Sequence, residues 1–503
     1  MQESFDLLII GGGVNGAGIA RDAAGRGMKV CLVEKDDLAQ HTSGASTKLV
    51  HGGLRYLEHL EFRLVRESLI ERERLLKIAP HIIWPMRFVL PHDQGLRPKW
   101  MLRLGLWLYD HLGGRKILPP TRDIDLRAPP HGAILEERLT RGFEYSDCWV
   151  EDSRLVALNC VDAAERGADI RTRTECIALD RRKDVWIADL RTQEGVESRI
   201  TANQVVNAAG PWVDKVLGRA MPNERHENLR LVKGSHLIFP RLFEGDHCYI
   251  FQNRDDRIIF AIPYEHKYTL VGTTDVSFEG DPSDIAISAD EATYICNAAN
   301  EYLAKDIRPE DAIASYAGVR PLYDNKARSN STVTRDYQFE FDRGDDGKAP
   351  ALLSIFGGKI TTYRKLAEHA LKKLGAPGRS WTAETALPGG DVAPEDFDRF
   401  IAEQAAAYPW LPRNMMGRLA RAYGTRLTHI LGDASDLSDL GAHLGGDLYA
   451  AELIYLVRNE FARSADDVLK RRSKLYLHLS AEEQDKVVHW FERVDFSELS
   501  SPE

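Results

Sequence analysis

Residues 5–34 read FDLLIIGGGVNGAGIARDAAGRGMKVCLVE, and this stretch decides the fold. Phe5–Ile10 is a short apolar run, which is typical of a fully buried parallel strand. Small residues after it predict a helix, and residues 29–34 predict a second strand that ends on Glu34. Between the first strand and the helix stand three glycines at GxGxxG spacing: Gly11, Gly13 and Gly16. The pattern indicates a strand–helix–strand unit built around a glycine turn.

Each glycine of this turn has a physical role. Gly11 permits the tight turn, Gly13 lets a pyrophosphate approach the backbone, and Gly16 lets helix and strand pack closely. The helix N-terminus offers free N–H groups and the positive end of its dipole to phosphates. Glu34 can accept hydrogen bonds from both ribose hydroxyls, and a carboxylate there disfavours a 2′-phosphate. The unit therefore predicts binding of FAD or NAD rather than NADP.

Composition bounds the remaining possibilities. At 503 residues the chain predicts two or three domains, and its net charge of −10 gives no indication of a nucleic-acid partner. Six scattered cysteines without a CxxC pair favour a reducing compartment and argue against a metal site. We expect no signal peptide, because the chain begins MQESFDLL, and no spanning helix, because no run of eighteen apolar residues occurs.

A polar, hydroxyl-rich loop follows Glu34, and we expect it to lie along the cofactor. It covers residues 35–48 and includes HTSGASTK, after which Leu49 opens the segment LVHGGLRY. In that segment a cation and a phenol, Arg55 and Tyr56, stand beside a double glycine. This arrangement suits close approach to an anionic ligand.

Two helices are predicted next. Residues 61–79 show a charged side and an apolar side, and Pro80 ends the pattern. Residues 97–115 read RPKWMLRLGLWLYDHLGGR and are apolar almost all round. Such a helix is either buried core or inserted at a membrane interface, and its Trp, Tyr and flanking cations favour the membrane slightly.

The rest of the chain alternates strands and helices before turning helical. Residues 168–200 predict a β-meander, 203–212 a buried strand with a glycine turn, and 231–275 an antiparallel sheet. A further glycine turn at residues 357–358 precedes a helix that runs to Leu374. Residues 375–390 have the composition of a linker, and residues 394–496 predict a separate helical domain.

Several of these motifs together resemble one family. The chain is similar to the FAD-dependent, respiratory glycerol-3-phosphate dehydrogenases of bacteria over nearly its whole length. The motifs that carry the resemblance are GGGVNGAGIARDAAGRG, TKLVHGGLRYLE, GFEYSDCWV, NAAGPWV, KGSH, GTTD, YAGVRPL, TRDY and FGGKITTYRKLAEHAL.

The resemblance implies an α/β fold with a glutathione-reductase-like (Rossmann-type) FAD-binding domain, an antiparallel β-rich substrate domain and a C-terminal α-helical domain. The expected boundaries are 1–80, 143–225 and 350–375 for the FAD-binding domain, 81–142 and 226–349 for the substrate domain, and 385–503 for the helical domain. It also implies oxidation of sn-glycerol 3-phosphate to dihydroxyacetone phosphate, with hydride passing from C2 to flavin N5 and electrons then reaching a membrane quinone.

The expected cofactor site gathers the glycine motifs and the loop. Its predicted FAD-binding residues are Gly11, Gly13, Asn15, Gly16, Glu34, Lys35, Thr42, Ser43, Ser46, Lys48, Leu49, Ala209, Gly210, Trp212, Gly357, Gly358, Lys359 and Thr361. The helix start at residues 357–361, with Lys359, would stabilise negative charge on the reduced flavin.

The expected substrate site is cationic, because a doubly negative phosphate needs several fixed donors and Arg is the best suited. The predicted substrate-binding residues are Arg55, Tyr56, Thr274, Arg320, Arg335 and Lys359. His is the commonest general base near neutral pH, so His236 in KGSH and His51 in VHGG are the candidate bases, in that order. The predicted catalytic residues are then His236, His51, Lys359 and Arg320.

Three alternatives stay open. An amino-acid or amine oxidase of the same fold would need one Arg for a carboxylate and a cage for an amine. A glycerol-3-phosphate oxidase would pass electrons to oxygen, although related oxidases carry an insertion that this chain lacks. A non-enzymatic FAD-bound membrane scaffold is the third.

For a respiratory dehydrogenase we expect a cytoplasmic protein that is attached peripherally to the inner face of the cell membrane. We expect no nucleic-acid partner, and the sequence leaves a homodimer open.

Overall fold

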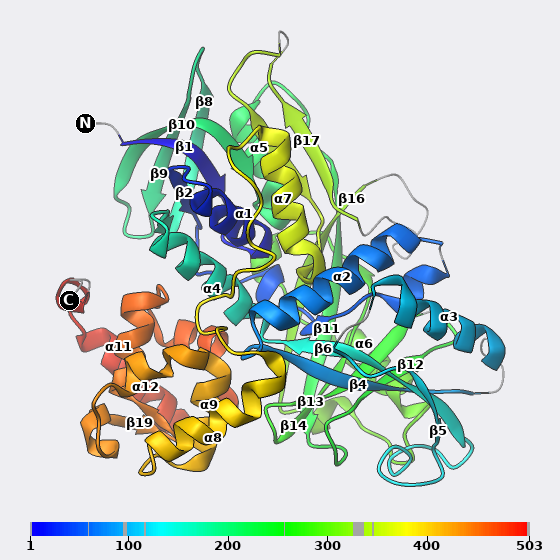
Figure 1. The fold of residues 1–503 in the computed structure, drawn as a ribbon. Helices are drawn as coiled ribbons and strands as arrows, with labels where there is room; N and C mark the ends of the chain where they lie inside the picture. Colours follow the sequence, from blue (N-terminus) through cyan, green and yellow to red (C-terminus); the bar gives the residue numbers. More distant parts are fainter. Residues whose placement is uncertain are drawn as a thin grey trace.

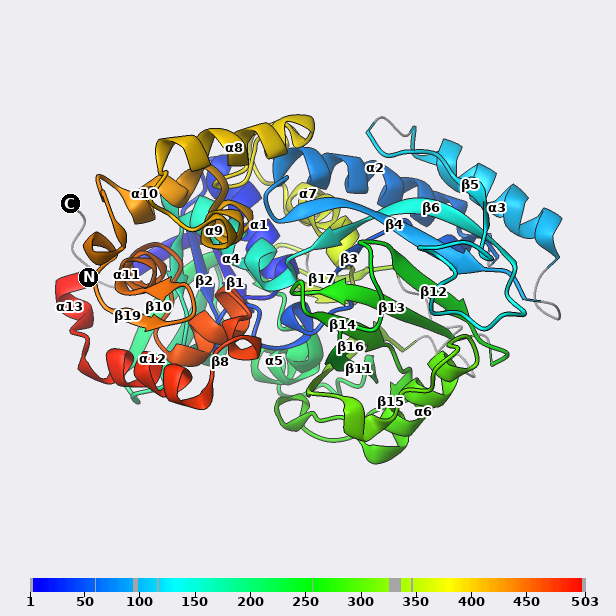
Figure 2. The same ribbon diagram turned by 90° about the horizontal axis from the view of Figure 1, so that it is seen from below.

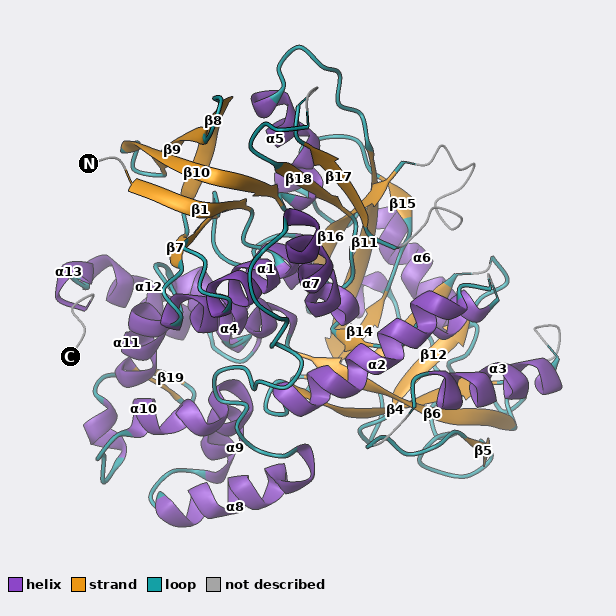
Figure 3. Ribbon diagram, turned by 45° about the horizontal axis from the view of Figure 1, so that its top comes forward, coloured by secondary structure: helices purple, strands orange, loops and turns teal. Residues whose placement is uncertain are grey.

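The chain folds into two β-sheet units and a C-terminal helical unit (Figure 1). The computed structural model describes residues 3–58, 60–93, 98–114, 117–255, 257–324, 336–344 and 347–499. Figure 3, coloured by secondary structure, shows the helices of the C-terminal unit gathered beside the first sheet and away from most of the second. The expected α/β fold with a β-rich second domain and a helical third one is confirmed.

Within the described residues the first sheet has eight strands. They are β1 (Glu3–Ile10), β2 (Val30–Val33), β7 (Asp169–Arg171), β8 (Thr174–Arg181), β9 (Trp186–Thr192), β10 (Glu197–Asn207), β17 (Gln338–Asp342) and β18 (Leu352–Phe356). Strands β18, β10, β1, β2 and β7 run parallel in that order. The apolar residues of β1 from Leu7 to Ile9 are fully buried, as their continuous apolar run predicts.

Helices cover one face of this sheet, and a meander covers the other. Helices α1 (Val14–Gly25), α4 (Asp152–Glu165) and α7 (Tyr363–Leu374) pack together on the first face. The small residues of α1 allow this close packing: a side chain at Gly18 would overlap the Tyr363 ring. On the other face, β8, β9 and α5 (Val213–Ala220) enclose Trp186, which is fully buried.

The second sheet has ten strands among the described residues. They are β3 (Leu49–Val50), β4 (Ile83–Pro91), β5 (Arg122–Asp125), β6 (Arg141–Val150), β11 (Leu229–Pro240), β12 (Cys248–Gln252), β13 (Ile258–Tyr264), β14 (Tyr268–Gly272), β15 (Val276–Ser277) and β16 (Ala314–Tyr323). Its pairings are antiparallel except for the parallel pair β4–β12. Helix α6 (Ala289–Asn300) packs against β11, β13 and β14. The predicted antiparallel sheet is therefore present, and it also contains strands β3 to β6 from the N-terminal part of the chain.

Three strands lie in a different sheet from the one that the predicted boundaries give them. The predicted boundaries place β3 and β6 in the FAD-binding domain, but β3 pairs with β6, and β6 also pairs with β4, in the second sheet. β17 was expected in the substrate domain, but it pairs with β18 at the edge of the first sheet. Strand pairing is decided by distant partners, which local composition does not reveal.

Helices α2 (Phe62–Ile78) and α3 (Lys99–Leu112) pack against each other beside the second sheet. Figure 2 shows α3 at one end of the molecule, at the periphery. One side of α3 is buried, at Leu102, Leu106 and Tyr109. The opposite side exposes Trp100, Met101, Leu104 and Trp107, at 69%, 37%, 50% and 55%. The buried-core alternative therefore holds for one side of the helix, and insertion of the other side at a membrane interface stays a prediction.

The buried phenol of Tyr109 changes one detail of the membrane prediction. Its oxygen lies 2.8 Å from both carboxylate oxygens of Asp147 and accepts a hydrogen bond from the Gly52 backbone N–H at 2.7 Å. Tyr109 therefore belongs to the core and not to an interfacial belt. Arg97, Arg115 and Lys116, which flank the helix in the sequence, lie outside the described residues. No helix in the described ranges has both the length and the apolarity needed to cross a bilayer.

The C-terminal unit has its own apolar core, around Leu419, Leu427, Leu453 and Val468. Its helices are α8 (Phe397–Ala407), α9 (Arg413–Tyr423), α10 (Leu427–Leu431), α11 (Ala450–Asn459), α12 (Ala481–Arg493) and α13 (Phe496–Leu499). A small hairpin of β19 (His443–Gly445) and β20 (Leu448–Tyr449) interrupts the predicted all-helical pattern.

Buried ion pairs join the C-terminal unit to the first sheet unit. Arg472 bonds both oxygens of Asp37, at 2.5 and 2.9 Å, and Arg154 pairs with Glu460. These four side chains are almost wholly buried, so removing one partner would leave an uncompensated charge in the interface. The C-terminal unit is thus held firmly against the loop that follows β2.

Candidate functional site

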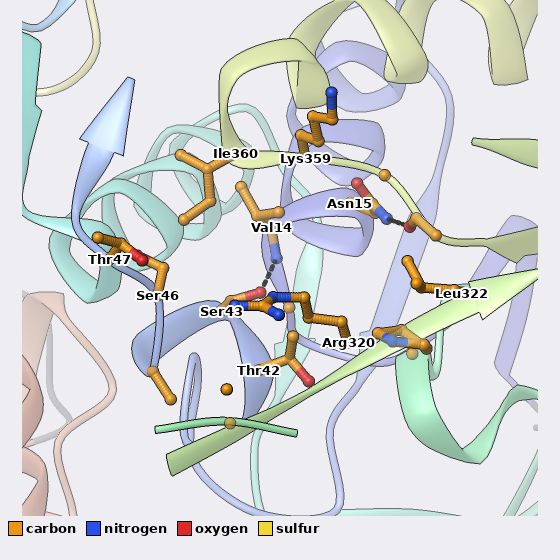
Figure 4. A pocket seen from close by; sticks show the side chains of 18 of the residues that line it. Val14, Asn15, Thr42, Ser43, Ser46, Thr47, Arg320, Leu322, Lys359 and Ile360 are labelled. Carbon is orange, nitrogen blue, oxygen red and sulfur yellow. Dashed lines mark hydrogen bonds between the residues drawn. The ribbon is translucent and has the colours of Figure 1, made fainter. Parts of the chain in front are cut away.

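A cavity of about 600 Å³ lies between the two sheets. The glycine turn after β1 and the end of β2 form one wall, and strands of the second sheet form another. Figure 4 shows side chains from both units around it. Ligands of α/β proteins bind beyond the carboxyl ends of parallel strands, and this cavity occupies that place.

The glycine turn leaves no room for side chains where the predicted pyrophosphate would lie. Gly11 has φ +114°, and a Cβ there would overlap the Ala208 carbonyl. A Cβ at Gly16 would overlap the Gly11 carbonyl oxygen, so Gly16 shapes the turn from behind and does not itself line the cavity. The Val14 N–H at the start of α1 donates to Ser43 Oγ at 3.0 Å, a bond drawn in Figure 4.

Glu34 closes the turn from the other strand. Its carboxylate accepts hydrogen bonds from the backbone N–H groups of Gly12, at 2.7 Å, and Asp36, at 2.9 Å. Burial raises the pKa of Glu34, and these two hydrogen bonds oppose that rise. The carboxyl group lies at the cavity wall, where the predicted ribose would be.

An aromatic ring marks one wall of the cavity. Trp212 lies in a 3₁₀ helix, Gly210–Trp212, at the start of α5. The Lys35 ammonium lies 4.4 Å from the centre of its ring, and the His41 imidazole meets it edge-on at 4.6 Å. A flat ring with a lysine ammonium beside it suits a flat ring system and a phosphate.

A second glycine turn meets the first one. Gly357 and Gly358 have φ values of +74° and +97°, and the Gly357 carbonyl accepts a bond from Asn15 Nδ2 at 3.1 Å. This bond, drawn in Figure 4, ties the turn to the first residues of α1. The turn leads into the 3₁₀ helix Ile360–Thr362, where Thr361 Oγ1 accepts from the His51 N–H at 3.2 Å.

The structure brings together nearly all the predicted cofactor residues. Those that line the cavity are Gly11, Gly13, Asn15, Glu34, Lys35, Thr42, Ser43, Ser46, Leu49, Ala209, Gly210, Trp212, Gly357, Gly358, Lys359 and Thr361. Gly16 and Lys48, the other two predicted residues, do not line it. The side chain of Lys48 points into the protein, where its ammonium bonds both oxygens of the buried Asp152 at 2.9 Å. Two glycine turns, a helix N-terminus and a carboxylate just after β2 together fit a dinucleotide.

Cations line the same cavity. Arg55, Arg320 and Lys359 all contribute to its wall, together with Tyr56. The Lys359 ammonium lies 3.8 Å from the centre of the Tyr56 ring and has no hydrogen-bond partner among the described residues, although it is buried. Arg335, the other predicted phosphate ligand, lies outside the described residues.

Arg320 is held in place by the strand end that carries GTTD. Its guanidinium bonds Asp275 Oδ1 at 2.8 Å, Thr273 Oγ1 at 3.2 Å and the Thr274 carbonyl at 3.3 Å. A Cβ at Gly234 would overlap this guanidinium, so the glycine of KGSH is required for Arg320 to cross β11. These contacts fix the orientation of the guanidinium in the cavity wall.

The hydroxyl of Thr274, a predicted substrate contact, bonds to groups inside the protein. It donates to Glu291 Oε1 at 2.8 Å and accepts from the Ser235 N–H at 3.0 Å. Burial alone would raise the pKa of Glu291, but the hydrogen bonds it receives, that from Lys233 foremost, hold the pKa below its ordinary value. Thr274 lines the cavity, yet its hydroxyl is engaged inward and its carbonyl supports Arg320.

Both candidate bases line the cavity. His236, on β11, is 2% exposed, and its Nε2 lies 3.0 Å from Thr47 Oγ1. Burial, with the cations Arg320 and Lys48 nearby, lowers the pKa of His236 well below its ordinary range, so its imidazole is neutral at neutral pH. His51 is half-buried beside Thr361.

Comparison with known proteins decides the family. A family model described as "FAD dependent oxidoreductase" matches residues 6–364, and one described as "C-terminal domain of alpha-glycerophosphate oxidase" matches residues 380–494. The chain belongs to the FAD-dependent oxidoreductases. This oxidoreductase is 51% identical over 498 residues to the D-erythritol 1-phosphate dehydrogenase of Brucella abortus, covering 98% of this chain and 99% of that protein. It is 49% identical over 488 residues to the glycerol-3-phosphate dehydrogenase of Pseudomonas aeruginosa, covering 96% and 94%.

A solved structure supports the same assignment. The glycerol-3-phosphate dehydrogenase of Bacillus halodurans complexed with FAD matches with a TM-score of 0.78 and 27% identity, covering 99% of this chain and 92% of that one. The cofactor of this oxidoreductase is FAD, and the cavity described above has the donors and the shape to hold it. The sequence-based prediction of FAD is confirmed.

The cavity of the oxidoreductase is also lined by residues that sequence reasoning did not select. The cavity wall includes Thr47, Gln252, Arg257, Phe260 and Asp275. Thr47 belongs to the motif TKLVHGGLRYLE and Asp275 to GTTD, so both could have been predicted from their position beside selected residues. Gln252, Arg257 and Phe260 come from β12, β13 and the turn between them, and no sequence signal separates them from ordinary sheet residues.

Proposed function

We propose that this flavoprotein oxidises sn-glycerol 3-phosphate to dihydroxyacetone phosphate and passes the electrons to a quinone in the membrane. The observation that carries the substrate class is the buried ammonium of Lys359, which has no hydrogen-bond partner among the described residues, in a cavity that also presents Arg55 and Arg320. An unpaired buried charge costs several kcal/mol, and a bound anion offsets that cost. Three cations suit a phosphate dianion better than a single carboxylate.

The relatives support two phosphorylated polyols. One is named for D-erythritol 1-phosphate and the other for glycerol 3-phosphate, and both substrates carry a phosphate and at least one secondary hydroxyl. The cationic wall addresses the phosphate that they share. D-Erythritol 1-phosphate is therefore the second candidate substrate, because the relative named for it is 51% identical to this chain.

The chemistry requires the alcohol carbon to lose its hydrogen and the hydroxyl to lose its proton. FAD, when bound, supplies the acceptor for the hydride. We assign the proton to His236, since Nε2 lies at the cavity-lining hydroxyl of Thr47 and the neutral imidazole is the form that accepts a proton. His51 is the second candidate. Arg320 and Lys359 hold the phosphate and supply the positive charge that balances it.

An anaerobic titration tests this function. The purified holoenzyme is mixed separately with sn-glycerol 3-phosphate, D-erythritol 1-phosphate, glycerol and glycine. The absorbance of the oxidised flavin band at about 450 nm is followed. We expect bleaching by a phosphorylated polyol and none by glycerol or glycine. Bleaching by glycine alone would indicate the amino-acid oxidase alternative, and the absence of any bleaching would favour the non-enzymatic scaffold.

Reoxidation of the reduced protein tests the acceptor. The bleached protein is mixed with a water-soluble quinone or with air-saturated buffer, and recovery of the flavin band is timed. We expect rapid recovery with the quinone and slow recovery with oxygen. Equal or faster recovery with oxygen would favour the oxidase alternative.

Arg320→Lys should lower kcat/KM for the phosphorylated substrate by at least about tenfold, or roughly 1.4 kcal/mol. Lysine keeps the charge but loses the fork that bonds Asp275, Thr273 and the Thr274 carbonyl. Steady-state kinetics with the quinone measures the effect.

Arg199→Lys is the matched control, because Arg199 forms an exposed forked pair with Asp189 on the first sheet, away from the cavity. Its kcat/KM should equal that of the wild type. Unchanged kinetics in Arg320→Lys would remove Arg320 from the substrate site. Arg335→Lys extends the same test to the residue that the structure does not describe.

The exposed face of α3 supports the membrane part of the proposal. Trp100, Leu104 and Trp107 project from one side of a peripheral helix that also carries Lys99 and Arg103. Such a face can lie in the headgroup plane, with its apolar side chains at the acyl boundary and its cations near anionic lipids. A quinone is dissolved in the bilayer, so an enzyme that reduces it gains by docking there. Attachment would be peripheral, at the cytoplasmic face.

A further inference from the structure

The loop Ser46–Lys48 separates the cavity from a buried carboxylate. Asp152, at the start of α4, is fully buried, and its oxygens bond the Lys48 ammonium at 2.9 Å. The same carboxylate accepts from the Ser46 N–H at 3.2 Å and the Ser46 hydroxyl at 2.8 Å. One carboxylate therefore holds both ends of a three-residue loop.

The central residue of this loop contacts His236. Thr47 Oγ1 lies 3.0 Å from Nε2 of the imidazole, and the other ring nitrogen, Nδ1, is buried without a hydrogen-bond partner among the described residues. The hydroxyl of Thr47 is thus the hydrogen-bonding group that sets the rotation of the ring. Because Ser46 and Lys48 are fixed on either side, Thr47 has little freedom to move.

Tyr316 connects the same loop to the opposite face of the imidazole. It lies opposite His236 in the pairing of β16 with β11, and the two rings stack at 4.8 Å with an interplanar angle of 18°. The Tyr316 hydroxyl donates to the Ser46 carbonyl at 2.7 Å, and the Lys48 ammonium lies 5.2 Å from the centre of its ring. On the neighbouring strand, a Cβ at Gly272 would overlap the imidazole, so the ring is enclosed from that side too.

We propose that Lys48, Asp152 and Tyr316 are positioning residues for His236. They fix the loop Ser46–Lys48, and the loop in turn fixes the imidazole through Thr47 and through the stacked phenol. None of the three lines the cavity, so each acts through another residue and not on the substrate. The inference rests on the proposed role of His236 as the proton acceptor. It also gives Lys48, which the sequence suggested as a cofactor ligand, its place in the site.

Tyr316→Phe tests the proposal with the least disturbance, because it keeps the stacked ring and removes only the bond to the Ser46 carbonyl. At saturating sn-glycerol 3-phosphate we expect anaerobic flavin reduction to slow by about three- to tenfold, the net worth of one hydrogen bond. The dissociation constant from the same stopped-flow titration should change by less than about twofold, since no phosphate ligand is altered. Flavin content and melting temperature are measured alongside.

The matched control is Tyr268→Phe. Tyr268 lies in β14 of the same sheet and donates its hydroxyl to the Leu477 carbonyl at 2.6 Å, but it does not line the cavity. The Tyr268→Phe variant loses an equivalent hydrogen bond away from His236, and its flavin should be reduced at the wild-type rate.

Thr47→Val removes the hydroxyl that bonds His236 and should slow flavin reduction by at least about tenfold. Thr47→Ser, which restores the hydroxyl, should recover most of the rate.

Asp152→Asn tests the buried anchor and should slow reduction at least as much as Tyr316→Phe does. If this variant does not fold, Tyr316→Phe decides the proposal. Wild-type reduction rates in Tyr316→Phe and Thr47→Val, with His236→Asn slow, would overturn the positioning role and leave the base assignment standing. A wild-type rate in His236→Asn would overturn the base assignment and the positioning role together, and bleaching by the substrate would still stand.

Discussion

Replacing His236 by Asn should slow anaerobic flavin reduction by sn-glycerol 3-phosphate by at least about 100-fold, the lower part of the range for loss of a general base. Asn can keep a hydrogen bond to Thr47 but cannot take a proton from the substrate hydroxyl. Stopped-flow reduction at saturating substrate measures the step directly. The substrate dissociation constant should change little, because the cations that hold the phosphate are unaltered.

Two further variants make this result decisive. His51→Asn removes the second candidate base and should have a smaller effect. His478→Asn removes a histidine that pairs with Glu265 away from the cavity, and it should behave as the wild type. A slow His51→Asn together with a fast His236→Asn would transfer the role of base to His51.

The double variant Trp100→Ser/Trp107→Ser should lose most of its binding to vesicles of phosphatidylethanolamine and phosphatidylglycerol. The two indoles are 69% and 55% exposed on the outer side of α3. Burying a large apolar side chain is worth about 1.5–3 kcal/mol, so the pair should account for at least about 100-fold in partitioning. Liposome flotation measures it, together with reduction of a lipid-dissolved quinone.

The control for the membrane test is Val196→Ser/Ile313→Ser, which removes two other apolar side chains that are 63% and 49% exposed. It should float like the wild type. High salt should release the wild type only in part and detergent should release it fully, because the contact is partly apolar. Equal flotation and equal quinone reduction in both double variants would exclude α3 and direct the search to the C-terminal helices.

Local patterns in the sequence were sufficient for the dinucleotide unit. Gly11, Gly13 and Gly16 follow a buried strand and precede a helix. Their spacing permits a tight turn, close approach of a pyrophosphate to the backbone, and close packing of helix against strand. The same holds for the second glycine turn at residues 357–358 and for the position of Glu34. Each of these features depends on residues close together in the chain, so each could be predicted locally, and the cavity is lined by most of the residues predicted for FAD.

Tertiary structure decided the features that depend on distant partners. The ammonium of Lys48 is bound by Asp152, 104 positions away, and the hydroxyl of Thr274 is used by Glu291. The side chain of His236 is set by Thr47 and Tyr316, which come from two other segments. A sequence motif shows that a polar residue is present, but only packing shows which partner satisfies its hydrogen bonds.

The sequence by itself, through its glycine motifs and its family resemblance, determined that this chain has an FAD-binding unit, and it predicted several cations near the site and the apolar helix α3. It did not determine which sheet β3, β6 and β17 join, or that Tyr109 lies in the core while Trp100 lies outside. The physical reason is that strand pairing and burial depend on which segments of the whole chain pack against each other. Neighbouring residues restrict local conformation, whereas the partner of a buried charge or of a sheet edge is known only once the chain is folded.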